Sequence, residues 1–484
     1  MIKKSLTIIF VAVSLQSCAT FSDSHPKKMS TIKDSFITDN DPTSQEGVIS
    51  DMFPDSNRNT SVGYLEKGRF DQLINSNLDS QHQYSSAITE VHTEAMAPII
   101  RASKIAQNSA AVLSSDKERD YVIPSYQITF LYAYQALNYL KQNRLEDAAV
   151  SIRNLSDAQD IKRKQEEQEK LERTQDSGTL SQVFNLRAVS SYLASSGKLK
   201  TVDNLAQGVS NSYANPLAYY LESIIYEAYD SDYNNALVSM RNAKNAAPNN
   251  KYITKTFDSF NDAMQGGSAY PNNTGRLTVI YEQGFVSPIS KCDIGIPMSA
   301  AFYTSMVFRA SIPAAKVSLP CYKLNYADRM LPPVDVSVYS YGKLVALDNT
   351  STLVDTLAMA AKSLQEDYPA ILTREVLRFA TKTISTIVAA NAARQSAGDY
   401  GPLASLAVTM AGSAYQHFTT VADIRSWLLL PNNAQLFVDN MPAGQYLVNV
   451  GSIQENVNIK NGKNTLVWIT SAGQYNVTQY NNFL

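Results

Sequence analysis

Residues 132–152 read YAYQALNYLKQNRLEDAAVSI, and their apolar positions recur at steps of three and four. That spacing is typical of one face of an α-helix. Asn143 and Arg144 interrupt the pattern, so we expect a turn there between two helices. The small side chains of Ala136 and Ala148 let these helices approach closely. The stretch therefore predicts a tightly packed helix pair.

A second stretch, residues 220–248, has the same pattern and ends at Pro248, which cannot continue a helix. Both stretches resemble tetratricopeptide helix pairs, although they start 88 residues apart, which is not a multiple of the roughly 34-residue period. Residues 157–176 between them carry a charge run and predict a solvated helix extension. We expect a tetratricopeptide-like helical array over residues 61–266, with a plain helical bundle as the alternative.

Beyond residue 266 apolar and polar residues alternate, which predicts strands. We expect residues 270–425 to form a mixed α/β domain, in which a small β-rich region precedes a helical hairpin over residues 352–420. Residues 349–351 offer side chains that cap its first helix. The strands expected in this domain are 276–282, 293–296, 301–308, 316–319 and 334–339.

The last part of the chain, residues 426–484, predicts a small β-sandwich-like module. The strands expected there are 434–438, 445–450, 457–459, 464–469 and 475–479. Residues 442–444 supply one turn, and Asn461-Gly462 is a strong signal for a β-hairpin. Taken together, the sequence predicts an α+β multidomain protein.

The N-terminus predicts export and lipidation. Two basic residues precede an apolar run over residues 6–15, and Cys18 follows Leu15, Gln16 and small Ser17. This order is typical of a secretory signal peptide, and the cysteine resembles the acylated residue of a bacterial lipoprotein. We expect residues 1–17 to be removed and Cys18 to carry the lipid. An ordinary signal peptide followed by a chance cysteine is the alternative.

The residues after Cys18 bear on location. Ala19, by resemblance to lipoprotein sorting signals, favours the periplasmic face of the outer membrane over the inner membrane. Residues 18–60 are rich in Ser, Asp, Thr, Asn and Pro, so they predict a flexible tether.

Two further cysteines remain, Cys292 and Cys321. An even pair in an exported protein is a candidate disulfide, and two buried free thiols are the equal alternative.

Residues with catalytic or metal-binding chemistry are sparse. The chain has four histidines, and the only local cluster is Glu90-Val-His92-Thr-Glu94, which does not supply a metal shell. No catalytic or phosphate-binding motif occurs, and a net charge of −2 gives no support for nucleic-acid binding. We expect no enzymatic activity, no metal and no cofactor apart from the lipid at Cys18.

Four stretches resemble a family of uncharacterised Gram-negative envelope lipoproteins. They are residues 132–149, Val279–Phe285, Ala422–Pro431 and Pro442–Tyr446. The resemblance implies a lipidated tetratricopeptide-like front half and a mixed α/β rear half. It implies no enzymatic activity, and it points to partners near the machinery of cell-wall synthesis.

The main functional hypothesis is a non-enzymatic protein–protein interaction scaffold in envelope or cell-wall assembly. Tyrosine suits interaction surfaces, and the candidate groove residues are Tyr132, Tyr139, Tyr220 and Tyr226. For each of them, packing in the core is the favoured alternative. The alternative is a peptidoglycan- or glycan-binding module in the rear β regions, with Trp468 and Tyr475 as aromatic candidates. A hydrolase with a scattered site is a third hypothesis.

Overall fold

The computed structural model describes residues 21–38, 42–54, 60–96, 120–173, 191, 192, 195, 197, 199–296, 315–324, 331–396 and 422–484. Its helices are α1 (Phe21–Thr38), α2 (Glu46–Met52), α3 (Thr60–Leu73), α4 (Asn77–Met96), α7 (Ser125–Lys141), α8 (Leu145–Arg173), α10 (Lys200–Ala206), α11 (Pro216–Ala228), α12 (Tyr233–Ala246), α13 (Lys251–Met264) and α15 (Thr356–Ser396), with a 3-10 turn, η1 (Pro42–Gln45), before α2.

Neighbouring helices pack in chain order. α3 lies against α4, α4 against α7 and α7 against α8, while α11 contacts α7, α8 and α12, and α12 contacts α13. Side-chain caps define where helices begin: Asn215 Oδ1 accepts the N–H of Leu217 at 3.0 Å before α11, and Asp232 Oδ1 accepts that of Asn235 at 3.1 Å before α12. Such caps typically contribute about 1 kcal/mol each. The expected helix extension is confirmed in part, because α8 runs unbroken to Arg173.

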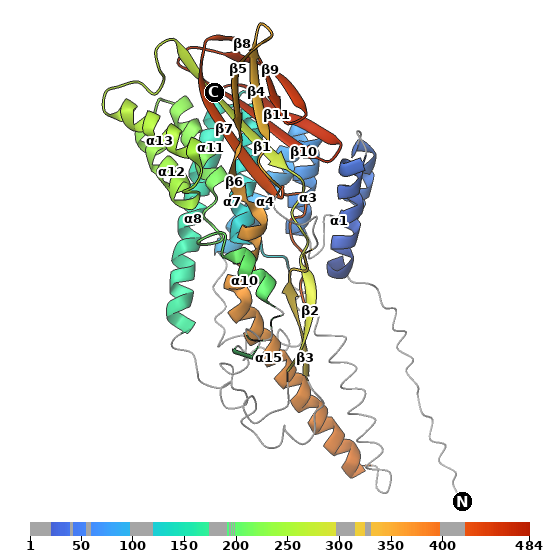
Figure 1. The fold of residues 1–484 in the computed structure, drawn as a ribbon. Coiled ribbons are helices and arrows are strands. Elements are labelled where there is room, and N and C mark those ends of the chain that lie inside the picture. Colours follow the sequence, from blue (N-terminus) through green and yellow to red (C-terminus); the bar gives the residue numbers. More distant parts are fainter. Residues whose placement is uncertain are drawn as a thin grey trace, which may run out of the picture.

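The strands are β1 (Thr274–Gln283), β2 (Ser290–Ile296), β3 (Ala315–Cys321), β4 (Asp335–Ser340), β5 (Lys343–Asn349), β6 (Ser351–Asp355), β7 (Asn433–Pro442), β8 (Gly444–Val450), β9 (Ile453–Ile459), β10 (Asn464–Ala472) and β11 (Tyr475–Phe483). They form a five-stranded sheet in the order β11-β10-β1-β7-β6, a four-stranded sheet in the order β5-β4-β8-β9, and the pair β2-β3. Most helices precede the strands along the chain, so the α+β class is confirmed (Figure 1).

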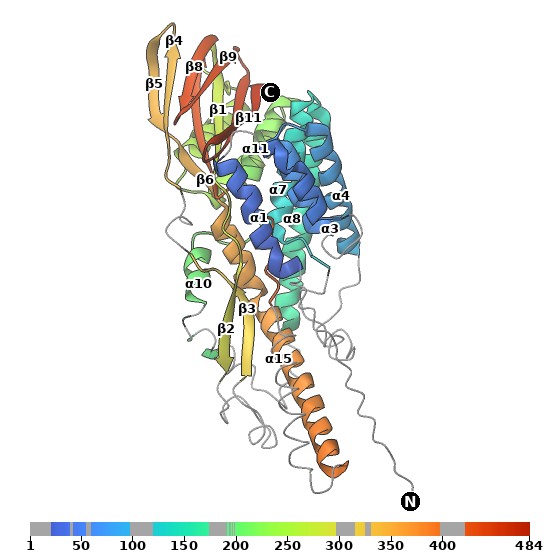
Figure 2. The same ribbon diagram turned by 90° about the vertical axis from the view of Figure 1, so that its right-hand side faces the viewer.

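The side chains of β1 point alternately toward the helices and toward the four-stranded sheet. Arg276 and Glu282 face the helices, because they bond to Glu227 of α11 and Arg69 of α3. Side chains alternate along a strand, so Val279 and its odd-numbered neighbours face the four-stranded sheet, whose β9 packs on β1 and β10. Helices therefore cover one face of the larger sheet and the smaller sheet covers the other (Figures 1 and 2).

Strands from both sides of residue 426, where we expected a domain boundary, share the two large sheets. β1 and β6 share a sheet with β7, β10 and β11, while β4 and β5 share the other with β8 and β9. The C-terminal strands therefore have no sheet of their own, since each of their sheets needs strands from residues 274–355. The expected strands 276–282, 293–296, 316–319 and 334–339 are confirmed, whereas 301–308 lies outside the described residues.

The expected hairpin at Asn461-Gly462 is wrong, although the turn exists. Gly462 has φ +67°, as a tight turn requires. However, β9 before it pairs with β8, and β10 after it pairs with β1 and β11. The turn carries the chain from one sheet to the other, because turn chemistry specifies a reversal and not the partner strand.

The expected tether over residues 18–60 is also wrong for most of its length. α1 and α2 occupy much of this range, and Met29, Ile32 and Phe36 of α1 are fully buried. These three apolar residues stand at helical spacing within a polar stretch, so one face of α1 joins the core despite its mean composition.

The expected helical hairpin starts later than predicted. Residues 351–355 form β6, and α15 begins at Thr356, where Asp355 Oδ1 accepts the N–H of Ala358 at 2.9 Å. The capping group is therefore Asp355. The second helix of the expected hairpin falls mainly on residues 397–421, which lie outside the described residues. Within the part of the chain that is described, no helix has the length and apolarity needed to cross a membrane.

Candidate functional site

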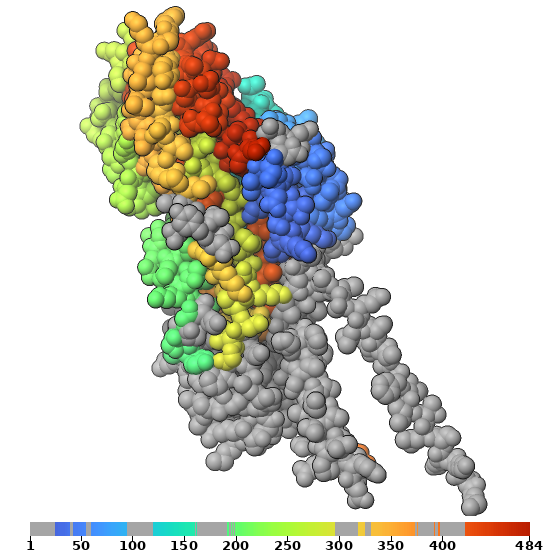
Figure 3. Space-filling view, turned by 45° about the vertical axis from the view of Figure 1, so that its right-hand side comes forward, coloured from blue at the N-terminus to red at the C-terminus, as the bar shows by residue number. Residues whose placement is uncertain are grey.

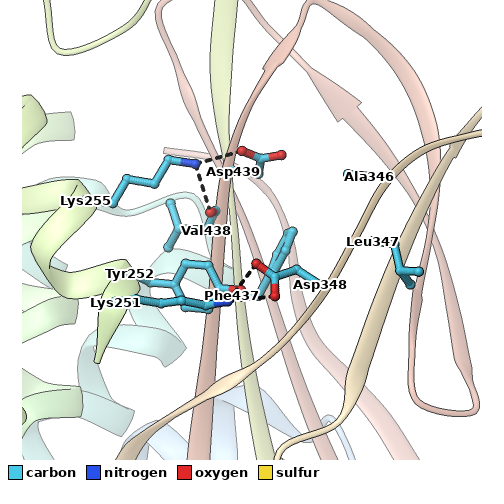
Figure 4. Close-up of a pocket in the computed structure, with 9 residues that line it drawn as sticks. All are labelled: Lys251, Tyr252, Lys255, Ala346, Leu347, Asp348, Phe437, Val438 and Asp439. Carbon is cyan, nitrogen blue, oxygen red and sulfur yellow. Dashed lines mark hydrogen bonds and ion pairs between the residues drawn. The ribbon is translucent and has the colours of Figure 1, made fainter. Parts of the chain in front are cut away.

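A groove of about 340 Å³ opens where α13 meets the edges of both large sheets (Figure 4). We call it the edge groove. It is lined by Lys251, Tyr252 and Lys255 of α13, Ala346, Leu347 and Asp348 of β5, and Phe437, Val438 and Asp439 of β7. Its volume falls in the range typical of ligand pockets.

One wall of the edge groove is the edge of β5, which pairs with β4 alone among the described strands. The N–H of Thr350 donates to the carbonyl of Val334, the residue before β4, at 2.9 Å. The peptide groups of Thr350 therefore point toward β4. Along an antiparallel strand, residues alternate between pointing their peptide groups toward the partner strand and away from it. Leu347 and Asn349 therefore turn their peptide groups away from β4, and the Tyr252 hydroxyl donates to Asn349 O at 2.6 Å.

The opposite wall is the upper part of β7. β6 pairs only with residues 433–436, and beyond them the described partner of β7 is β1. The carbonyl of Val438 faces α13, since Lys255 Nζ lies 3.4 Å from it and 2.7 Å from Asp439 Oδ1. Two strand edges thus open on the same groove, and side chains of α13 bond to one carbonyl of each, Asn349 O and Val438 O.

The charges of the edge groove balance. Lys251 pairs with Asp348 at 2.6 Å and Lys255 pairs with Asp439 at 2.7 Å, all four side chains being partly exposed. The hydrogen bond from Lys251 lowers the pKa of the Asp348 carboxyl. Exposed pairs contribute only about 0.2–1 kcal/mol each. With two lysines against two aspartates, the formal charge of the groove is zero, and its remaining lining is largely apolar.

The β4–β5 hairpin beside the groove exposes apolar side chains. Tyr341 at its tip is fully exposed, Leu344 and Val345 are half-exposed and Leu347 is 65% exposed. Tyr341 and Gly342 have positive φ values of 46° and 73°, as in a two-residue hairpin turn. Clustered exposed apolar residues mark interaction surfaces. The hairpin reaches one end of the molecule (orange in Figure 3).

The four tyrosines predicted to line an interaction groove lie elsewhere. Tyr132 and Tyr220 are buried, as the core-packing alternative expects, and Tyr139 and Tyr226 are half-buried. Burial raises the pKa of Tyr132 to about 12. The structure does not bring these residues to the edge groove.

The protein's own sheet covers part of the helical layer. The hydroxyl of Tyr134 on α7 donates to Glu282 of β1 at 2.7 Å. The ring of buried Trp427 packs at 5.9 Å from the rings of both Tyr84 and Tyr134. A partner segment therefore does not have free access to this part of the helices.

A buried charge cluster joins α3 to the larger sheet. Arg69 pairs with Glu282, and Thr470 donates to the same carboxylate at 2.6 Å. The guanidinium also stacks 4.1 Å from the Tyr134 ring centroid. Burial alone would lower the pKa of Arg69, but the charge and hydrogen bond of Glu282, together with Tyr134 and Tyr84, outweigh it and the pKa is raised. Sequence reasoning missed this cluster, although an acid at residue 282 inside an apolar strand was a visible signal.

Neither aromatic candidate for glycan binding lies free on a sheet face. Trp468 is fully buried. Tyr475 donates to Leu73 O at 2.7 Å and its ring packs 5.1 Å from that of Phe36. Both therefore hold the larger sheet against the helices.

Cys292 and Cys321 form a disulfide between β2 and β3, with Cα atoms 5.9 Å apart. Of the two alternatives left open by the sequence, the structure contains the bonded one. Cys18 lies outside the described residues. His92 Nε2 lies 3.4 Å from the Tyr132 hydroxyl, and the described residues contain no group of three acids, histidines or cysteines that would suit a metal.

Comparisons with protein-family models, with curated proteins and with solved structures find no match to this chain, so the edge groove must be judged on its own geometry.

Proposed function

We propose that this protein is a lipid-anchored, non-enzymatic scaffold of the bacterial envelope. Its docking surface is the edge groove together with the β4–β5 hairpin. The observation that carries the proposal is the open edge of β5, with Leu347 65% exposed beside a neutral groove. The tyrosines of the helical layer have no part in this surface.

The structure of the N-terminal region supports a short anchor. α1 begins at Phe21, three residues after Cys18, and these residues span at most about 11 Å. With a lipid on Cys18, the start of α1 is held near the membrane. The β4–β5 hairpin lies at one end of the molecule, α15 reaches toward the other end, and the start of α1 lies between them (Figures 1 and 2).

The disulfide supports an extracytoplasmic location. Such bonds persist in the periplasm and are rare in the cytosol. Both cysteines are buried, and they lie on β2 and β3, which form a separate two-stranded sheet. Export, an outer-membrane anchor and an oxidised pair are consistent with one another.

The helix order supports a tetratricopeptide-like array as part of the proposal. The pairs α3–α4, α7–α8 and α11–α12 follow one another and contact in sequence. In this proposal the array acts as an internal support, because its inner residues Arg69 and Tyr134 bind the sheet. It holds the β-sandwich while the sandwich presents the docking surface.

Site-specific photocrosslinking in living cells tests the function. A photoreactive amino acid replaces Leu347, and one at Val238 of α12, which is 48% exposed, serves as the matched control. We expect a discrete protein adduct at residue 347, absent at 238 and lost when Cys18→Ala releases the protein from the membrane.

Equal labelling at both positions, or membrane attachment that survives Cys18→Ala, contradicts the anchored scaffold. Adducts with cell-wall material at residue 347, together with binding to purified sacculi, would instead favour the glycan-binding alternative.

A further inference from the structure

We propose that the edge groove binds an extended, uncharged polypeptide segment of a partner as an added β-strand beside β5. The proposal deepens the scaffold function and rests on it for its cellular role, although strand binding is testable on the purified protein. The occupant is a protein segment with apolar side chains on both faces of the strand.

The backbone of β5 offers hydrogen-bonding groups at its open edge. The peptide groups of Leu347 point away from β4, as follows from the hydrogen bond between Thr350 and Val334. The hydrogen bond from Tyr252 to Asn349 O agrees with this orientation. An outward peptide group at a sheet edge is the element to which an added strand binds. The edge groove supplies the space on that side, between β5 and α13 (Figure 4).

The second step concerns side chains. Ala346 and Asp348 stand opposite Val338 and Val336 of β4, so they share the inner face with these buried valines. Leu347 points to the outer face. An added strand therefore places alternate side chains toward the groove, near Phe437, and the others beside exposed Leu347. Two apolar rows favour a segment with apolar residues on both faces.

The third step concerns charge. All four charged side chains of the groove are already in ion pairs. A charged segment would have to disrupt a pair, whereas an uncharged one leaves both in place. Binding should therefore depend little on salt, because screening acts on net charge attraction.

The hairpin also has features that discourage indiscriminate pairing. The register of β4 and β5 shifts between Val338 and Tyr339, next to the tip. Such bulges interrupt pairing at exposed edges. The shift leaves residues 346–349 in regular pairing, and residues 346–348 of these line the groove. The added strand is thus confined to the groove end of β5.

The test uses the full chain purified in detergent and a display library of random linear peptides about ten residues long, enough for a strand of usual length. The most enriched peptide is labelled with fluorescein and its affinity is measured by anisotropy. Leu347→Pro removes the outward N–H, and proline is tolerated at such edge positions. Leu347→Thr keeps the N–H and is the matched control.

We expect Leu347→Pro to weaken binding about tenfold or more, and Leu347→Thr to weaken it by less than about threefold. Unfolding midpoints establish that both variants are folded. A second measurement does not depend on proline: with Leu347→Cys, disulfide trapping of peptides that carry cysteine at successive positions should alternate with a period of two.

Three results would overturn the proposal. They are enriched peptides that bind Leu347→Pro as well as the parent protein, trapping without a period of two, and failure to enrich any peptide dependent on residue 347. A purified protein that is dimeric and becomes monomeric with Leu347→Pro identifies a second copy as the occupant. Peptide binding in vitro without an adduct in cells separates this proposal from the cellular scaffold role.

Discussion

Glu282 illustrates how a single residue stabilises the contact between helices and sheet. Its carboxylate accepts from Arg69, Tyr134 and Thr470, which come from α3, α7 and β10. Both charged partners are fully buried, so neither is solvated if the other is lost. The residue therefore connects three elements through one group.

We expect Glu282→Gln to lower the free energy of unfolding by about 3 kcal/mol, because it leaves a buried guanidinium without a counter-charge. Urea denaturation followed by circular dichroism measures the change. Asp147→Asn, in an exposed pair with Arg144, is the control and should change stability by less than about 1 kcal/mol. Equal effects of the two substitutions would show that Glu282 has no special role.

Glu222 of α11 gives a prediction about pH. Burial raises its pKa from the ordinary value of 4.5 to about 7, although a hydrogen bond from Ser156 opposes the shift. Between pH 4.5 and about 7, the Glu222 carboxyl is therefore protonated in the folded state and ionised in the unfolded state. The contribution of this protonation to the free energy of unfolding is complete below pH 4.5 and is lost as the pH rises through 7.

Glu222→Gln should remove this part of the pH dependence, so that the variant gains stability relative to the parent protein between pH 5 and pH 8. Chemical denaturation at both pH values provides the comparison. Exposed Glu146→Gln should leave the slope unchanged. An unaltered slope in Glu222→Gln would mean that this carboxyl does not titrate differently in the folded state.

Among the elements, α1 differs most from expectation. Phe36 on its last turn contacts the rings of Phe70 and Phe285 at 5.7 Å and that of Tyr475 at 5.1 Å. We expect Phe36→Ala to destabilise the protein by about 3–5 kcal/mol, as large core truncations do. Thermal unfolding measures the effect.

Ile37, one residue later, is 42% exposed, and its replacement by alanine is the control. It should change stability by less than about 1 kcal/mol. Similar small effects at both positions would restore the tether interpretation.

The disulfide between Cys292 and Cys321 stabilises a single pair of elements, because it joins β2 to β3. Its two cysteines are 29 positions apart in the sequence, and for a loop of that size the chain-entropy account predicts a contribution of about 3–4 kcal/mol. Replacing Cys292 and Cys321 together by serine should lower the denaturant midpoint accordingly. An unchanged midpoint would indicate that this pair unfolds independently of the main body.

The strands of the rear half show how far local patterns extend. Residues 276–282 and the five C-terminal segments alternate, and the structure places strands there. β5 escaped prediction because Leu344, Val345 and Leu347 are consecutive or nearly so and lie at an exposed edge, which breaks the alternation. Apolar and polar residues alternate in a strand when one of its faces is buried, and little of β5 is buried.

At the scale of the whole molecule, the α+β class follows from the sequence but the pairing of strands does not. β1 pairs with β10, nearly two hundred residues away, and nothing local to either strand specifies the other. The edge groove escaped prediction for the same reason. Its lysines, aspartates and apolar residues come from three elements that are remote in sequence.

The parallel pairing of β1 with β10 has a consequence for biogenesis. Residues 276–283 of β1 pair on one side with β7 and on the other side with residues 464–471 of β10. That second side stays without a partner until β10 has been made, nearly two hundred residues later. Folding of this sheet should therefore be slow, since distant contacts must form first. Until they form, the unpaired side of β1 is open to aggregation.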